Sequence, residues 1–192
     1  MYYGAIKKFD VANGEGVRSS LFVSGCRNKC KNCFQPETWA FDYGREFTEE
    51  AKEELFSSMN LGSVRGISIL GGEPMEPENQ VALLPLLREF KQRFPEKTVW
   101  LYTGNLYEEL LGMLGAHEKH LPITEELLSY VDILVDGRYV EELKQLGLRF
   151  RGSSNQRIID LKKTKSSGSI VIWDGCRFDK KFSNKKEDNN EG

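Results

Sequence analysis

The sequence has no apolar run long enough to cross a membrane, and its amino-terminal residues MYYGAIKKFD lack the basic start and apolar core of a secretory signal. It also lacks an excess of charge of one sign: 27 lysines and arginines stand against 29 aspartates and glutamates, a net charge of -2. A chain without a positive field is a poor ligand for phosphate backbones or anionic lipid. We therefore expect a cytoplasmic protein that binds neither nucleic acid nor a membrane.

Cysteine is scarce, with four residues in 192, which is too few for a disulfide scaffold. Three of the four lie within eight residues, where disulfide pairing would leave one thiol over, so metal ligation explains the crowding better. The hydrophobic fraction of 39% and charged fraction of 29% are ordinary for a globular chain. We expect one domain over residues 1–178 and a disordered polar tail over residues 179–192.

Short apolar runs typical of buried strands recur along the chain. They predict strands at residues 18–24, 66–70, 98–102 and 131–135. Two further β-rich segments, residues 157–161 and 169–173, flank turn-forming residues at 166–168 and therefore predict a hairpin.

Amphipathic segments between these strands predict helices. Thr48 caps the first, which Glu49 and Glu50 open, and a second covers residues 79–94, where Pro85 kinks it or delays its start. Capping residues and apolar spacing predict three more: one from Asn105 with Glu108 as its capping-box partner, one from Thr124, and one over residues 139–146 that Gly147 ends. Such alternation implies an α/β fold with a mostly parallel sheet, and the units are too few for a closed eight-stranded barrel. We expect an open, partial βα barrel.

The cysteine cluster has the spacing C-x3-C-x2-C and follows the first predicted strand directly, with Cys26, Cys30 and Cys33 as its thiols. Thiolates are the soft ligands that iron-sulfur clusters need, and a compact loop can direct three of them at one site. Three thiolates leave one iron of a 4Fe-4S cluster without a protein ligand, and catalytic metal sites keep such an open position. Basic side chains between the cysteines are expected to favour the thiolate form: Arg27, Lys29 and Lys31.

Two other uses of the same thiols remain open. Cys176, His117 or His120 could complete a zinc site with them, and Cys176 could be the fourth ligand of an electron-transfer cluster. In the catalytic interpretation, Cys176 is a spare thiol.

The cysteine spacing after the first strand of a partial βα barrel resembles that of the radical S-adenosylmethionine (radical SAM) superfamily. Within it, five blocks resemble the activating proteins of anaerobic ribonucleoside-triphosphate reductase: NGEGVRSSLFVSGC (13–26), ILGGEP (69–74), LYTGN (101–105), DILVDGRYVEELK (132–144) and FRGSSNQRIIDL (150–161). The resemblance implies a 4Fe-4S cluster on the three cysteines, with S-adenosylmethionine chelated to the fourth iron. It also implies a 5'-deoxyadenosyl radical that takes a hydrogen atom from a glycine of the reductase large subunit, with reduced flavodoxin as the expected electron donor.

The resemblance further implies where the cofactor binds. Gly71, Gly72 and Glu73 match the GGE motif of the superfamily, which meets the amino group of S-adenosylmethionine; glycines allow close backbone approach, and a carboxylate accepts from an ammonium. Thr103 ends the third predicted strand and is a further candidate contact. All these segments follow the carboxyl ends of predicted parallel strands, the edge at which such folds bind ligands.

Asn32 and Phe34 flank the last cysteine, where superfamily members hold the adenine, although Phe34 is equally explained as a core aromatic. The polar block of residues 151–157 is expected to shape the cofactor edge or the face that docks the reductase. Another activase, acting for example on pyruvate formate-lyase, would share the cysteine motif. The short chain and the SSNQR block favour the reductase activator.

Overall fold

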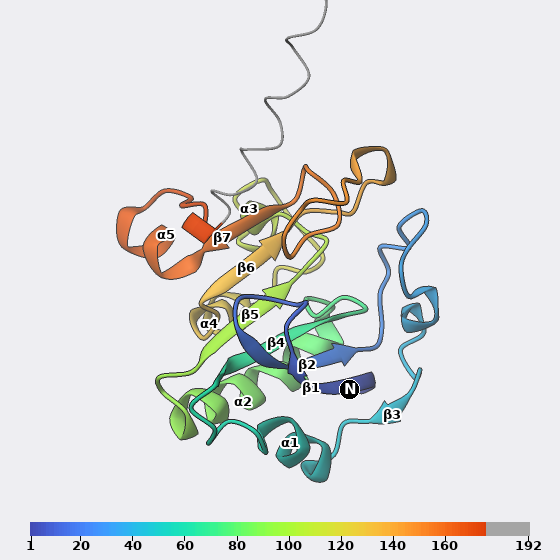
Figure 1. The fold of residues 1–192 in the computed structure, drawn as a ribbon. Coiled ribbons are helices and arrows are strands. Elements are labelled where there is room, and N and C mark those ends of the chain that lie inside the picture. Colours follow the sequence, from blue (N-terminus) through green and yellow to red (C-terminus); the bar gives the residue numbers. More distant parts are fainter. Residues whose placement is uncertain (176–192) are drawn as a thin grey trace, which may run out of the picture.

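The computed structural model describes residues 1–175, so Cys176 and the tail predicted to be disordered lie outside the described residues. Within residues 1–175, seven strands form one mixed sheet in the order β3-β1-β2-β4-β5-β6-β7 (Figure 1). Their bounds are β1 (Tyr2–Asp10), β2 (Val17–Val23), β3 (Arg45–Glu46), β4 (Val64–Gly71), β5 (Thr98–Tyr102), β6 (Ile133–Asp136) and β7 (Arg157–Asp160). The four central strands β2, β4, β5 and β6 run parallel, whereas β1, β3 and β7 add antiparallel pairings at the two edges.

The helices of the described part are α1 (Glu49–Phe56), α2 (Pro77–Arg93), α3 (Tyr107–Leu110), α4 (Thr124–Ser129) and α5 (Leu161–Ser167), with 3-10 turns at Pro36–Trp39 and Glu141–Leu143. Helices α1, α2 and α4 cover one face of the sheet, where their apolar residues pack on Leu21, Ile67 and Leu101 in the main core (Figure 1). Within residues 1–175, no helix combines the length and apolar character that a membrane span requires.

The opposite face of the sheet carries a smaller aromatic cluster. Trp100 packs edge-on against Phe150 and Trp173, with ring centroids 5.3 Å and 5.1 Å away. Beside it the guanidinium of Arg18 is buried and donates hydrogen bonds of 2.7 Å to the carbonyl oxygens of Ile67 and Thr98. Because successive strand residues point to opposite faces, the same strands supply both the main core and this second, partly polar layer.

Several predicted elements are confirmed. Strands β2, β4, β5 and β6 lie where the apolar runs predict them. Thr48 is the N-cap of α1 and accepts a hydrogen bond from the backbone N–H of Ala51. Pro85 lies inside α2 and does not delay its start, which Pro77 occupies at a position where a missing N–H costs no hydrogen bond.

Other predictions are wrong at the level of local structure. The helix expected over residues 139–146 is only the 3-10 turn Glu141–Leu143. The helix expected from Asn105 begins later, with Leu106 at its N-cap, and is a single turn because Gly112 takes a left-handed φ of 67° just beyond it. Thr124 is the first residue of α4, not its cap; its hydroxyl donates to Gln80 Oε1 at 2.7 Å.

The predicted hairpin is replaced by a strand, a helix and a return segment. Asp160 caps α5 by accepting from the N–H of Lys163, and Gly168 ends that helix at φ 69°. The returning chain still meets β7 in antiparallel fashion, since Trp173 N donates to Ile158 O at 2.8 Å. Strand β1 was not predicted at all, because its exposed and half-buried residues form no apolar run.

Candidate functional site

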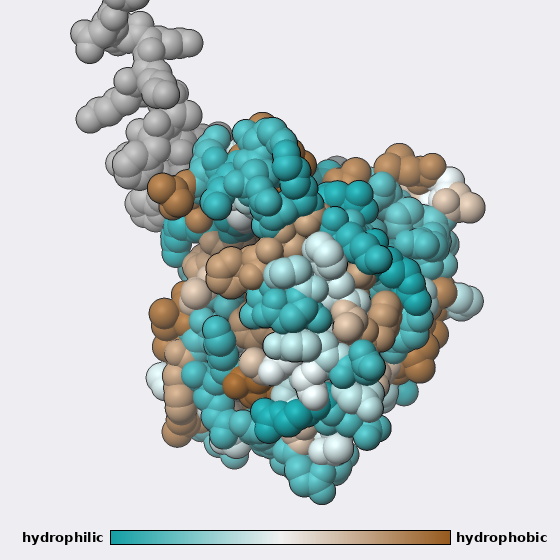
Figure 2. All heavy atoms as spheres, turned by 90° about the vertical axis from the view of Figure 1, so that its right-hand side faces the viewer, coloured by the Kyte–Doolittle hydropathy of each residue, from teal (hydrophilic) through white to brown (hydrophobic). Residues whose placement is uncertain are grey.

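The cysteine loop, residues 25–35, leaves the sheet at the carboxyl end of β2. Two backbone hydrogen bonds join the start of this loop to the 3-10 turn Pro36–Trp39. Gly25 N donates to Thr38 O at 2.8 Å, and Cys26 N donates to Trp39 O at 3.2 Å. All three thiols are free; Cys26 is buried, and Cys30 and Cys33 are half-buried. The loop and the segment after β6 lie together at the right of Figure 1, and Figure 2 views that side, where polar and apolar residues are interspersed.

Burial governs the acidity of two of these thiols. It raises the pKa of Cys26 to about 11 and also raises the pKa of Cys30, where the positive charge of Arg138 opposes the effect. The expectation that basic neighbours in the loop favour the thiolate is therefore wrong for both. Arg27 is instead paired with Glu76 and Glu78, each at 2.6 Å, and Lys31 with Glu142 at 3.4 Å. Metal loading would have to remove protons from these thiols.

The donor set suits an iron-sulfur cluster better than a single zinc ion. Among residues 1–175, the three thiols are not all within 4.8 Å of one another. The group of three possible metal ligands that meets this limit consists instead of Glu49, Glu53 and Glu89. A zinc ion needs its sulfurs converged at about 2.3 Å from the metal, whereas a cluster takes each thiolate on a separate iron. The acidic group itself is neutralised by Lys52 and Arg93.

Glu73 of the GGE motif lies at the centre of the contacts around the cysteine loop. Its side chain is only 1% exposed, and burial raises its pKa. Oε1 accepts hydrogen bonds from Thr103 Oγ1 at 2.8 Å and Met75 N at 2.9 Å, while Oε2 accepts from Asn28 Nδ2 and Gly104 N, both at 2.8 Å. Two predicted site residues, Glu73 and Thr103, are thus in direct contact, and Asn28 ties both to the cysteine loop.

The two glycines before Glu73 are required by close packing within the chain. Gly71 ends β4 at φ 110°, and Gly72 N donates to Val23 O at 2.7 Å. A Cβ on Gly72 would lie 2.6 Å from Gly25 O, which is closer than a side chain can approach. The motif therefore holds the end of β4 against the start of the cysteine loop.

The residues that flank the last cysteine are both exposed. Asn32 has a left-handed φ of 57°, and Phe34 is 96% exposed. The interpretation of Phe34 as a core aromatic is wrong. A fully exposed ring next to Cys33 has its whole apolar face available for a ligand or a partner.

Four side chains around the cysteine loop were missed by sequence reasoning: Asn28, Glu76, Lys119 and Arg138. Glu76 is fully buried and accepts from Arg27 N and Lys119 Nζ, each at 2.7 Å; the Lys119 side chain is 1% exposed. Lysine is usually exposed, so nothing in the segment between the two histidines marked this one. The nearest signal for Glu76 is its position three residues past the GGE glutamate.

The polar block of residues 151–157 holds the segment after β6. Gln156 accepts from Gly152 N at 2.8 Å and donates to Gly137 O at 3.0 Å. Arg157 donates to Asp136 Oδ1 at 2.9 Å and pairs with Glu108 at 2.7 Å. The polar block therefore stabilises the backbone at the carboxyl end of β6 through hydrogen bonds within the chain.

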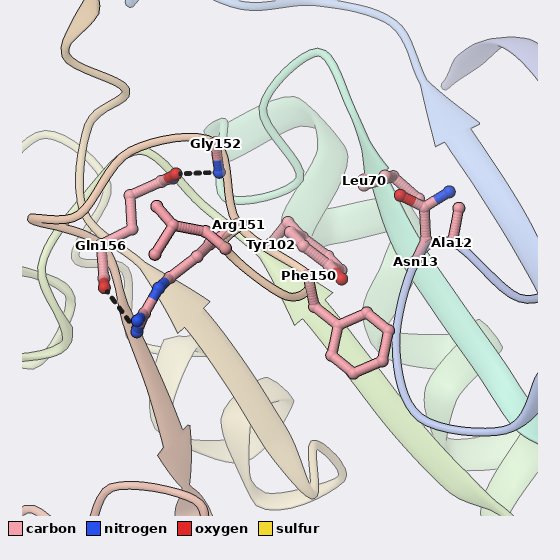
Figure 3. Close-up of a pocket in the computed structure, with 9 residues that line it drawn as sticks. Ala12, Asn13, Leu70, Tyr102, Phe150, Arg151, Gly152 and Gln156 are labelled. Atoms are coloured by element: carbon pink, nitrogen blue, oxygen red, sulfur yellow. Dashed lines mark hydrogen bonds between the residues drawn. The ribbon is translucent and has the colours of Figure 1, made fainter. Parts of the chain in front are cut away.

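A cavity of about 360 Å³ lies beside the GGE motif. It is lined by Ala12, Asn13, Leu70, Tyr102, Leu148, Phe150, Arg151, Gly152 and Gln156 (Figure 3). Leu70 and Tyr102 immediately precede Gly71 and Thr103 at the ends of β4 and β5. The Tyr102 hydroxyl is buried without a hydrogen-bond partner among the described residues, and burial raises its pKa. An unpaired buried hydroxyl is costly, so a polar group of a ligand in this cavity would stabilise it.

Comparison with known proteins agrees with the donor set. The family model of the 4Fe-4S single cluster domain matches residues 12–159, so the chain carries such a domain. The chain is 38% identical over 160 residues to the anaerobic ribonucleoside-triphosphate reductase-activating protein of Vibrio cholerae, which covers 82% of this chain and 97% of the relative. The proteins of the same name from Enterobacteria phage T4 (38% over 158 residues, 82% and 93%) and Escherichia coli K12 (32% over 164 residues, 84% and 100%) are also similar. The chain belongs to the family of anaerobic ribonucleoside-triphosphate reductase-activating proteins.

Proposed function

We propose that this protein activates an anaerobic ribonucleoside-triphosphate reductase by making a glycyl radical on it, through reductive cleavage of S-adenosylmethionine at a 4Fe-4S cluster. Cys26, Cys30 and Cys33 are the proposed cluster ligands. The observation that carries the proposal is the junction at Glu73, whose carboxylate binds the cysteine loop through Asn28 and the end of β5 through Thr103. The cysteine loop and the GGE motif thereby lie together at one edge of the sheet.

The chemistry belongs to the two cofactors, and the chain supplies position and shielding. A cluster bound there would supply, with one electron from an external donor, for which reduced flavodoxin is our proposal, the reductive cleavage of S-adenosylmethionine to methionine and a 5'-deoxyadenosyl radical, which would become 5'-deoxyadenosine on taking a hydrogen atom from the glycine. The three thiols would hold the cluster. Cys26 is buried, and the backbone contacts of Gly25 and Cys26 would limit the access of water to its thiol when the cluster is bound.

We assign the binding of S-adenosylmethionine to the residues around the cavity and the GGE motif. Gly71 and Gly72 let the end of β4 pack closely on the start of the cysteine loop, and Glu73 places a buried carboxyl group there, although four donors of the chain already occupy its oxygens. The ligand's amino group would therefore use backbone carbonyls or displace Asn28. Thr103 orients Glu73, while Phe34, with Asn32 beside it, would pack on the adenine.

We further propose that the sheet is the open partial βα barrel of the radical SAM type. The parallel run β2-β4-β5-β6 supports this, since the cysteine loop, the GGE motif, Thr103 and Asp136 lie at the carboxyl ends of these four strands. Ligands of parallel βα folds bind at that edge.

The test is anaerobic reconstitution with iron and sulfide, followed by dithionite reduction with S-adenosylmethionine and assay of methionine and 5'-deoxyadenosine. Cys30→Ala is the test variant and Cys176→Ala the matched control. We expect both products in equal amounts from the wild type and from Cys176→Ala, and neither from Cys30→Ala. A glycyl-radical signal in the electron paramagnetic resonance (EPR) spectrum on addition of the reductase would complete the assignment.

Three results would overturn the proposal. Zinc retention without cleavage would mean that the thiols hold a structural ion. Loss of the cluster in Cys176→Ala would mean a fourth protein ligand, and hence no open iron. Cleavage without a radical on the reductase would move the activity to another protein substrate.

A further inference from the structure

We propose that Arg138 is a positioning residue for the iron-sulfur centre: it holds the cysteine loop through Asn28 and places a positive charge there that favours the reduced cluster. This inference rests on the proposed function, because it requires a cluster on the loop. Arg138 follows β6 by two residues and lies 110 positions from Asn28 in the sequence.

The side chain of Arg138 reaches the cysteine loop directly. Its guanidinium donates to Asn28 Oδ1 at 3.2 Å, and the amide nitrogen of the same Asn28 donates to Glu73 Oε2 at 2.8 Å. Asn28 lies two residues before Cys30 and is thus held from both ends of its amide. Arg138 and Glu73 together fix the conformation of the loop between its first two cysteines.

The backbone that carries Arg138 is held by the polar block. Asn155 Nδ2 donates to Arg138 O at 2.8 Å, and Gln156 Nε2 donates to Gly137 O at 3.0 Å. Gly137 N donates to Asn105 O at 3.2 Å on the other side. The polar block therefore acts on the cysteine loop indirectly, because it holds the backbone that positions Arg138.

The charge of Arg138 is available to the cluster in a way that two neighbouring charges are not. Arg27 is neutralised by Glu76 and Glu78, and Lys31 lies 3.4 Å from Glu142. Arg138 instead donates to the neutral side-chain amide of Asn28, two residues before Cys30. Net charge near a cluster and hydrogen bonds around it set its reduction potential, and a cation stabilises the more negative, reduced form.

The experiment compares midpoint potentials of the reconstituted protein by redox titration followed with EPR. Arg138→Gln removes the charge and keeps a donor of similar length, Arg138→Lys restores the charge, and Arg149→Gln removes an exposed arginine of the adjacent loop as a control. For Arg138→Gln we expect the ratio of reduced to oxidised cluster at a fixed potential to fall about threefold, equivalent to a shift of about -28 mV for one electron. Arg138→Lys should recover most of it, and Arg149→Gln should match the wild type.

Iron and sulfide analysis distinguishes failure of the proposed function from failure of the role of Arg138. Absence of a cluster in the wild type would defeat the proposed function itself. A normal cluster content with an unchanged potential in Arg138→Gln, or an equal shift in Arg149→Gln, would overturn the role of Arg138 alone. A shift in Arg138→Gln that Arg138→Lys does not recover would also overturn the charge argument, since both variants then report only on loop geometry.

Discussion

The side-chain amide of Asn28 donates a 2.8 Å hydrogen bond to the carboxylate of Glu73, which lies 45 residues further along the chain. Through this contact the cysteine loop after β2 and the GGE loop after β4 become one unit. Because Glu73 also accepts from Thr103, the unit extends to the end of β5. The effects of substitutions at these three positions on the free energy of unfolding should therefore not be additive.

Gly72→Ala tests the close packing of the GGE loop. The new Cβ would meet Gly25 O at 2.6 Å and Thr38 O at 3.0 Å, so we expect a loss of about 2 kcal/mol in unfolding free energy and a lower iron content after reconstitution. Urea denaturation of the metal-free protein gives the first quantity. Gly62→Ala is the matched control because a Cβ there meets nothing within 4 Å. Equal effects of the two variants would contradict the packing argument.

Glu76→Gln tests the buried pair behind the cysteine loop. The substitution leaves the ammonium of Lys119, 1% exposed, without its buried carboxylate, and we expect a destabilisation of about 3 kcal/mol by urea denaturation. Glu118→Gln removes the other, exposed partner of Lys119 and should change the unfolding free energy by less than about 1 kcal/mol. Equal unfolding free energies of the two variants would mean that Glu76 is not the main stabilising partner of Lys119.

Glu78 should contribute to acid sensitivity. Its hydrogen bonds with Arg27 lower its pKa from 4.5 to about 2, so the folded protein keeps it ionised where the unfolded chain protonates it. The stabilisation is therefore complete above pH 4.5 and is lost as the pH falls toward about 2. We expect Glu78→Gln to flatten the fall of unfolding free energy across this window. Added salt should weaken the difference between the two proteins, because Glu78 is half exposed.

Phe34→Ala should separate stability from binding. The ring is 96% exposed, so its removal should change the unfolding free energy by less than about 0.5 kcal/mol. If the ring packs on the adenine, the dissociation constant for S-adenosylmethionine should rise about fivefold, as expected for an aromatic contact of about 1 kcal/mol. Equilibrium binding to the reconstituted protein measures it, with Phe34→Tyr as the variant that retains a ring. Unchanged affinity in Phe34→Ala would remove Phe34 from the cofactor site.

Local pattern was sufficient for the central strands and for the cysteine motif. The runs at residues 66–70 and 98–102 predict β4 and β5 closely, because a strand buried on both faces needs continuous apolar residues. The spacing of Cys26, Cys30 and Cys33 is equally local, since one short loop carries all three thiols. Strand β1, next to the short edge strand β3, is not predicted because its partly exposed residues form no such run.

Elements that depend on distant partners were not predictable from pattern. Residues 139–146 have helical spacing, but the chain there is tied down by Ser153, whose hydroxyl accepts from Val140 N at 3.2 Å, and by the ladder contact between Lys144 and Ser153. These contacts hold the segment in a form that leaves room for only the turn Glu141–Leu143.

The sequence by itself therefore determined the three-cysteine motif that we propose as the ligand set, the central strands and the edge at which they end, since each follows from residues within a few positions of one another. Only the tertiary structure decided which side chains surround the thiols. Glu73, Lys119 and Arg138 reach the cysteine loop or its support from β4, from the segment before α4 and from the end of β6, and their roles come from burial and hydrogen bonds across the fold. Such contacts depend on distances in space, which spacing along the chain does not encode.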